Sequence, residues 1–162
     1  NNTAKGNNYG LELELEWQAT EDLNLYANLG LLETEFEDYI TADGLDLSGR
    51  EQAHAPAYQY ALGGRYNLGG GFYIRADFEG KDDYFVSDSH NSKAPSHNLL
   101  HMRAGYMTQQ WSVAVWARNL TDEDYFVRGF RFPNDPRQGY ITESYYQFGD
   151  PRVAGVSLSY SF

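Results

Sequence analysis

The sequence contains no cysteine, and its 162 residues include only five prolines and twelve basic side chains. The lack of cysteine excludes disulfides and thiolate metal sites. The 23 acidic residues give a formal net charge of -11, which argues against nucleic-acid binding because phosphate contacts need clustered lysine and arginine. No run approaches the roughly 20 apolar residues of a membrane helix. With no linker or low-complexity segment, we expect one domain over residues 1–162.

The sequence instead alternates apolar and polar residues with a period of two. In YGLELELEWQA, the odd positions from Tyr9 to Trp17 are apolar, and Glu12, Glu14 and Glu16 lie between them. The pattern recurs over about 23–31, 58–68, 72–79, 100–106, 111–118 and 150–162. It predicts an all-β antiparallel meander of seven strands, with an eighth expected within 139–148 if one has been missed.

The connections and the aromatic residues favour a transmembrane barrel. Tight turns at QATED, LGGG and TQQ alternate with long connections near 38–55, 87–97 and 128–149, which all fall at the other end. Short turns at one end and long loops at the other are typical of outer-membrane barrels. An aromatic belt is predicted at the short-turn end, and it comprises Trp17, Tyr66, Phe72, Tyr106, Trp111, Tyr160 and Phe162. A second girdle is expected from Phe36, Tyr58, Phe85 and Tyr125.

A soluble barrel of lipocalin type is the alternative fold, because alternation alone does not say whether the apolar face points inward or outward. The loop asymmetry, the aromatic belt and the aromatic residue at position 162 would be three separate coincidences in a soluble barrel. Together they favour an apolar face that contacts lipid.

Two motifs in the last third of the chain resemble the C-terminal end of TonB-dependent receptors. The first is an N-L-T-D-x-x-Y sequence over 119–125; the second is Gly149, Pro151 and Arg152, followed by a strand that ends at Phe162. The resemblance implies a 22-stranded barrel of the bacterial outer membrane that is closed by an N-terminal plug. It also implies import of a scarce nutrient (siderophore-bound iron, cobalamin, haem or an oligosaccharide) with energy delivered through TonB.

The sequence lacks the plug, the TonB-contacting segment and most of the strands of that family, so we expect a C-terminal segment of the barrel. Seven strands in lipid would also leave two edges with unsatisfied backbone groups. The expected partners are the plug and remaining strands, the TonB complex through the missing N-terminal part, and lipid with lipopolysaccharide. The alternative is a small complete outer-membrane barrel with an adhesin or structural role, although its interior would be filled by side chains.

The last long connection carries the candidate ligand-binding residues, because loops on a rigid scaffold often carry binding. Guanidinium groups beside aromatic rings suit an anionic or aromatic ligand. The candidates are Arg128, Arg131, Phe132, Arg137, Tyr140, Tyr145 and Tyr146. The alternative is that these residues order the loop or contact lipopolysaccharide.

The final strand is predicted to act as an assembly signal. Val156, Leu158, Tyr160 and Phe162 share one face, and an alternating strand that ends in phenylalanine resembles the signal read by the barrel-assembly machinery. The remaining patterns favour neither catalysis nor a cofactor. His90, His97 and His101 lack a familiar metal-ligand spacing, and the three glutamates from Glu12 to Glu16 are typical of a wetted polar wall.

Overall fold

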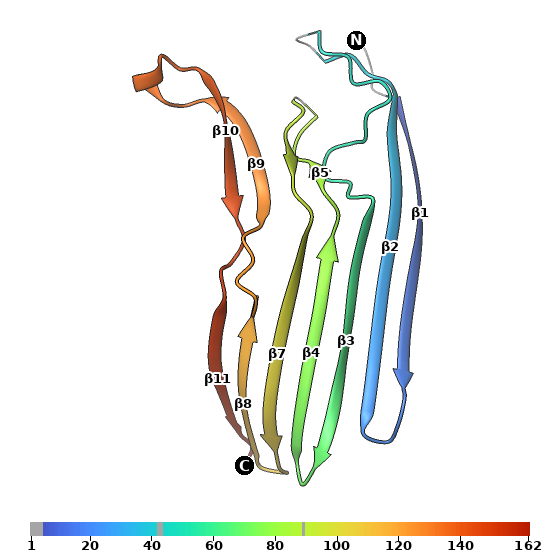
Figure 1. Cartoon of the computed structure of the whole chain (residues 1–162), viewed down its shortest axis with the longest axis vertical. Coiled ribbons are helices and arrows are strands. Elements are labelled where there is room, and N and C mark those ends of the chain that lie inside the picture. Colours follow the sequence, from blue (N-terminus) through green and yellow to red (C-terminus); the bar gives the residue numbers. More distant parts are fainter. Residues whose placement is uncertain (1–4, 42–43, 89) are drawn as a thin grey trace.

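The computed structural model describes residues 5–41, 44–88 and 90–162. They form a curved antiparallel sheet with two small hairpins at one end (Figure 1). The sheet has seven strands in the order β1-β2-β3-β4-β7-β8-β11. The strands are β1 (Lys5–Gln18), β2 (Leu23–Asp38), β3 (Tyr58–Gly69), β4 (Phe72–Lys81), β7 (His97–Met107), β8 (Trp111–Arg118) and β11 (Val153–Tyr160).

Two further strand pairs lie in the long connections. Strand β5 (Tyr84–Phe85) pairs with β6 (Lys93–Ala94), and β9 (Phe126–Pro133) pairs with β10 (Thr142–Phe148). A 3-10 turn, η1 (Pro136–Gln138), lies between β9 and β10. Strand β10 falls within the 139–148 segment where an eighth strand was expected, but it pairs with β9 and does not join the main sheet. No helix in the described part of the chain is long and apolar enough to cross a membrane.

The strand register separates the two kinds of side chain as the alternation predicts. Leu11 pairs with Leu31 and Leu13 with Leu29, while Glu14 lies opposite Asn28. Since neighbouring residues point to opposite faces, one face of the sheet is apolar and the other polar. Leu11, Leu13 and Leu15 are 52%, 53% and 56% exposed, so nothing in the described residues covers the apolar face there.

The buried apolar residues lie in the long connections or on the polar face of the sheet, where Tyr73, Leu99 and Ala114 are found, and not on its apolar face. Leu47 is 2% exposed, and Tyr84, Val86 and Ala94 form a small cluster against Phe126. This distribution is opposite to that of a soluble barrel, in which the apolar sheet face would be the core.

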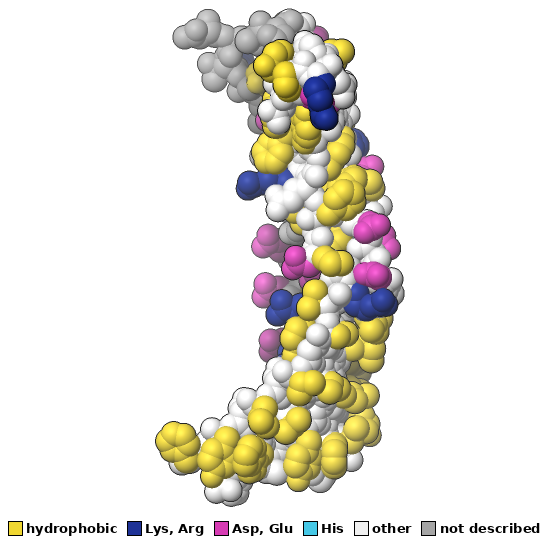
Figure 2. Space-filling view, turned by 90° about the vertical axis from the view of Figure 1, so that its left-hand side faces the viewer, with side chains coloured by type: hydrophobic (Ala, Val, Ile, Leu, Met, Phe, Trp, Pro, Cys, Tyr) yellow, Lys and Arg dark blue, Asp and Glu magenta, His cyan; other side chains and the backbone are white. Residues whose placement is uncertain are grey.

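The short-turn end carries the predicted aromatic belt. The rings of Phe72 and Tyr106 lie 4.7 Å apart, and those of Trp111 and Tyr160 lie 4.5 Å apart. Figure 2 shows hydrophobic side chains gathered at this end of the molecule. The turn between β3 and β4 needs glycine at Gly71, which has a φ of 91° and where a Cβ would collide with the carbonyl oxygen of Met107.

The prediction of a second girdle is wrong for most of its members. Phe36 shares the strand face of Thr34 and is buried, and its ring lies 4.8 Å from that of Tyr39. Tyr125 packs on His97 at 4.6 Å and lines a hollow on the polar side of the sheet. Phe85 lies in β5, away from the main sheet. Contacts on the polar side of the sheet and within the long connections take these rings away from the apolar face.

Candidate functional site

The candidate ligand-binding residues lie on or at the tip of the β9–β10 hairpin, which continues from the ends of β8 and β11 to about the level that β1 and β2 reach (Figure 1). The register pairs Phe132 with Glu143, Tyr145 with Phe130 and Tyr146 with Gly129. Arg128, Phe132 and Tyr145 therefore share one face of the hairpin, while Arg131 and Tyr146 share the other.

The outer face of the hairpin is the one that carries Arg128, Phe132 and Tyr145. The rings of Phe132 and Tyr145 stack at 4.8 Å, and the guanidinium of Arg128 lies 5.9 Å from the ring centre of Phe130. This arrangement offers a flat aromatic surface beside one cation, a combination that binds aromatic or anionic groups.

The opposite face of the hairpin packs against the connection between β4 and β7. Val86 lies directly over Gly129, where a Cβ would come within 2.7 Å of a Val86 methyl carbon. The hydroxyls of Ser92 and Ser144 are 3.4 Å apart, and Phe126 stacks with Tyr146 at 4.6 Å. Arg131 and Tyr146 are consequently on the side that faces the neighbouring loop, although both remain exposed.

The tip of the hairpin separates Arg137 and Tyr140 from the other candidates. Arg137 donates from Nε and Nη2 to the two carboxylate oxygens of Asp135, each at 3.0 Å. These hydrogen bonds hold the pKa of Asp135 below its ordinary value. Gly139 and Tyr140 both have positive φ angles, 67° and 59°, which turn Tyr140 outward into solvent. The structure thus brings together Phe132 and Tyr145, but it does not gather the three predicted arginines.

Arg50, in the connection between β2 and β3, was not predicted, yet it joins two of the long loops. It donates from Nη1 to His90 O (3.0 Å) and Asn91 Oδ1 (2.8 Å), and from Nη2 to Ser87 O at 3.1 Å. Its guanidinium lies 4.4 Å from the ring centre of Phe85. Burial lowers the pKa of Arg50 below its ordinary value.

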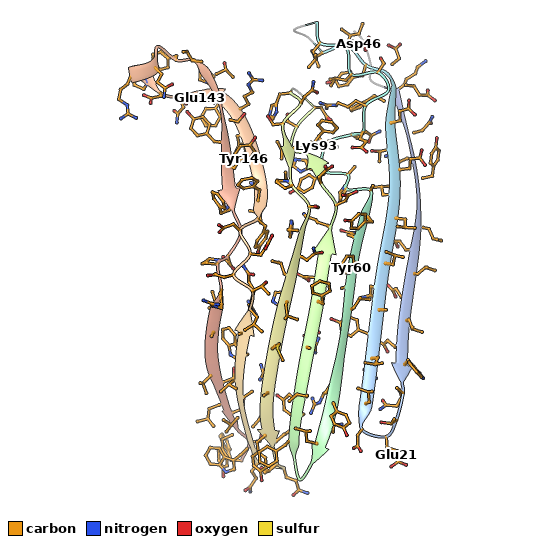
Figure 3. The ribbon with its side chains drawn as sticks, in the orientation of Figure 1. Glu21, Asp46, Tyr60, Lys93, Glu143 and Tyr146 are labelled. Carbon is orange, nitrogen blue, oxygen red and sulfur yellow. The ribbon has the colours of Figure 1, made fainter. Side chains whose placement is uncertain are left out.

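Lys93 makes a second connection between the same two loops, near its label in Figure 3. Its Nζ is 2.9 Å from Asp83 Oδ1 and 3.3 Å from Glu51 Oε2, and it lies 4.5 Å from the ring centre of Phe85. The hydrogen bond to Asp83 and the contact with Glu51 raise the pKa of Lys93. Phe85 therefore contacts two cations that come from different loops.

The polar face of the sheet carries a network of paired charges. Arg75 forks onto Asp77, with Nε to Oδ2 at 2.8 Å and Nη2 to Oδ1 at 2.8 Å, and the Tyr26 hydroxyl donates to Asp77 Oδ1 at 2.7 Å. Arg103 Nε donates to the hydroxyl of Tyr73 at 3.0 Å. Such bidentate and charge-assisted contacts are geometrically specific.

Glu12, Glu14 and Glu16 form an anionic ladder on the polar face of β1. Their spacing of two residues places successive carboxylates about 7 Å apart along the strand. Glu12 and Glu14 line an open hollow of about 540 Å3, to which Glu79, Lys81 and His97 also contribute. Within the described residues, no ion pair neutralises the ladder.

The two sequence motifs meet in space at the neck between the sheet and the hairpin. Asn119, which is 2% exposed, donates from Nδ2 to Glu123 O (2.9 Å) and Asp150 O (3.1 Å), and its Oδ1 accepts from Glu123 N at 2.9 Å. Asp122 Oδ1 accepts from Arg152 N at 2.8 Å. Gly149 leaves room for the Tyr125 ring, which a Cβ would overlap. The motif residues therefore fix where β8 ends and β11 begins.

The predicted assembly-signal residues lie on or just after β11. Val156 pairs with Val115, Leu158 with Val113 and Tyr160 with Trp111, all on the apolar face, and all three are exposed. Phe162 follows the strand, with its ring 6.3 Å from that of Tyr160. Their role as a signal stays a prediction.

In the described part of the chain, no group of three or more histidine, aspartate or glutamate side chains could hold a metal ion.

Comparison with known proteins matches this arrangement to one family. The family model for the β-barrel of TonB-dependent receptor-like proteins matches residues 1–120. The siderophore receptor PiuA of Acinetobacter baumannii superposes with a TM-score of 0.79 at 17% identity, covering 98% of this chain and 22% of that one. The ferric yersiniabactin uptake receptor FyuA of Yersinia pestis superposes with a TM-score of 0.79 at 18% identity, covering 98% of this chain and 24% of that one. The ferric citrate transporter FecA superposes with a TM-score of 0.73 at 19% identity, covering 98% of this chain and 25% of that one. The chain thus spans a quarter or less of the length of each of these receptors.

Proposed function

The chain belongs to the TonB-dependent receptor-like β-barrel family, and we propose that it is the C-terminal part of the barrel of an outer-membrane transporter for a scarce nutrient. Proteins of this family are transport receptors of the bacterial outer membrane, and the chain is an outer-membrane barrel segment. The proposal assigns it no enzymatic role.

One observation carries the proposal: a sheet with one apolar and one polar face, whose long connections all lie at the same end. The apolar face suits lipid, and the polar face suits a hydrated lumen. Strands β1 and β11 are the two edges of this sheet and are not paired with each other in the described residues. Unpaired backbone groups in lipid are costly, which supports further strands beside both edges.

We propose a ferric siderophore as the transported ligand. The solved relatives include a siderophore receptor, a ferric yersiniabactin receptor and a ferric citrate transporter. On this chain, the outer face of the hairpin carries the stacked rings of Phe132 and Tyr145 beside Arg128. Aromatic faces with a nearby guanidinium suit the aromatic or anionic groups of such a chelate. Haem, cobalamin and oligosaccharide are the competing ligands.

The proposed partners follow from the two faces of the sheet. The anionic ladder of Glu12, Glu14 and Glu16 would contact basic residues of the plug within the lumen, because opposite charges are complementary. The apolar face contacts membrane lipid, and lipopolysaccharide would lie outside the hairpin. TonB would act through the N-terminal part of the receptor, and the assembly machinery would read the final strand.

The test is uptake of radiolabelled ferric complexes by cells that express the full-length receptor, with and without TonB. We expect accumulation of at least one siderophore complex that stops when TonB is absent. Substituting both Phe132→Ala and Tyr145→Ala should weaken binding of that complex by about tenfold, since an aromatic contact contributes roughly 0.5–1.5 kcal/mol beyond its buried area. The matched control is Glu21→Gln, in a turn at the opposite end of the sheet from the hairpin (Figure 3).

Two outcomes would contradict the proposal. Uptake that continues without TonB would show that the receptor does not carry out energy-coupled transport. TonB-dependent uptake of haem, cobalamin or an oligosaccharide, with no ferric siderophore transported, would keep the transport role and replace the ligand.

A further inference from the structure

Three long connections converge on His90, which is 4% exposed. His90 itself lies between β5 and β6. Arg50 reaches it from the connection between β2 and β3, and donates to the His90 carbonyl oxygen at 3.0 Å. Arg131, on β9, acts on His90 electrostatically, as Arg50 does, because both positive charges lower the pKa of His90. One buried histidine is thus subject to the positive charges of two guanidinium groups that come from different loops.

The ring of His90 holds the turn that follows it. The backbone N–H of Ser92 donates to His90 Nδ1 at 3.3 Å, so this nitrogen must be unprotonated. Ser92 in turn contacts Ser144 of the hairpin through the two hydroxyls. On the same connection, Asp88 Oδ1 is already shared between Arg50 Nη2 at 3.5 Å and the backbone N–H of Ala53 at 3.0 Å. A positive imidazolium would therefore meet two cations and one engaged carboxylate.

We propose that His90 is a pH-sensitive latch, which holds the connection between β5 and β6 against its neighbours when neutral and releases it when protonated. A proton from water adds to Nδ1, the Ser92 N–H loses its acceptor, and the ring becomes a third cation beside Arg50 and Arg131. The inference concerns only the loops and does not depend on the identity of the ligand.

The direction of the titration agrees with this geometry. Burial, followed by the charges of Arg131 and Arg50, lowers the pKa of His90 below its ordinary value of 6.5. The unfolded loop therefore binds the proton more readily than the closed loop. The closed state is fully stable above pH 6.5 and loses stability as the pH falls below it, by up to tenfold in the opening equilibrium for each pH unit.

The test is amide hydrogen exchange on the full-length receptor in detergent micelles, at pH 7.5 and 5.5, with rates corrected for the intrinsic pH dependence and no ligand added. Protection across 84–88 and 90–94 should fall at pH 5.5 in the native protein, by up to about tenfold. In His90→Asn, the amide oxygen can accept from Ser92 N–H but cannot titrate, so its protection should be the same at both pH values.

The two arginines of β9 give a matched second comparison. Arg131→Gln removes one repelling cation and should reduce the loss of protection, whereas Arg128→Gln, on the opposite face of β9, should leave it as in the native protein. Unchanged protection in the native protein, or an equal loss in His90→Asn, overturns the proposal. If His90→Asn fails to assemble, an equal loss in Arg131→Gln and Arg128→Gln overturns it.

Discussion

Replacing Asn119 by alanine tests whether the neck between the sheet and the hairpin depends on one buried amide. The substitution removes three hydrogen bonds, to Glu123 O, Asp150 O and Glu123 N. Each contributes about 1 kcal/mol net, and backbone groups left buried without a partner add to the loss. Asn119 also has a φ of 47°, a region that alanine adopts less readily than asparagine. We expect a local destabilisation of about 3–5 kcal/mol.

Hydrogen exchange on the full-length receptor in micelles measures this effect directly. A loss of about 3 kcal/mol corresponds to more than a hundredfold faster exchange at Glu123 N, and at Leu120 N and Arg152 N, which are held at the same neck. The control is Asn67→Ala, because within the described residues the exposed Asn67 side chain accepts a single hydrogen bond, from Arg65 Nε at 3.1 Å. If both variants change exchange by less than about threefold, then the neck is held by the β8–β11 pairing and our reasoning about Asn119 is wrong.

Two more substitutions test the distal loops and the final strand. Arg50→Lys keeps the positive charge but loses the planar guanidinium that donates to both His90 O and Ser87 O. The 82–96 connection should therefore become several-fold more sensitive to limited proteolysis. Equal sensitivity of the native protein and the variant would refute a role for the guanidinium. Phe162→Ala should reduce the amount of folded receptor in the outer membrane, measured by heat-modifiable gel mobility, far more than it reduces ligand affinity. Leu45→Ala, which shortens another exposed apolar side chain, is the control, and an equal yield from both variants would contradict the signal role.

The strands could be predicted because their alternation is a local property of the sequence. Leu13 and Glu14 point to opposite faces whatever lies beside them, and once the turn after Gln18 is placed, the pairing of Leu13 with Leu29 follows. The aromatic belt was predicted on the same grounds, since Trp111 and Tyr160 each lie next to a short turn or at a strand end. The same alternation, counted along β2, puts Phe36 and Thr34 on the polar side. The prediction of a second girdle was wrong for Phe36 because it did not follow this alternation to the end of the strand.

The loop contacts could not be predicted because they join residues far apart in the sequence. Arg50 meets His90 across 40 positions, and Asn119 meets Asp150 across 31. Nothing in the sequence near Arg50 distinguishes it from the other arginines. The resemblance to TonB-dependent receptors did identify the residues around Asn119, but it did not give their contacts. The alternation within β9 sends the candidate residues Arg128 and Arg131 to opposite faces of the hairpin, which follows only once the strand pair is known.

On the proposed function, the distribution of unpaired charge would separate the part of the molecule that selects a ligand from the part that holds the plug. On the polar wall, Arg75 is held by Asp77 and Arg103 by the Tyr73 hydroxyl, so these cations are already engaged. Within the described residues, the glutamate ladder on β1 has no counter-ion, and Arg128 on the hairpin makes no ion pair. An anionic ferric chelate would be attracted to Arg128 and repelled by the ladder, whereas a basic surface of the plug would be held by the ladder. On the proposed function, the choice of ligand is therefore made at the hairpin, before the ligand reaches the lumen.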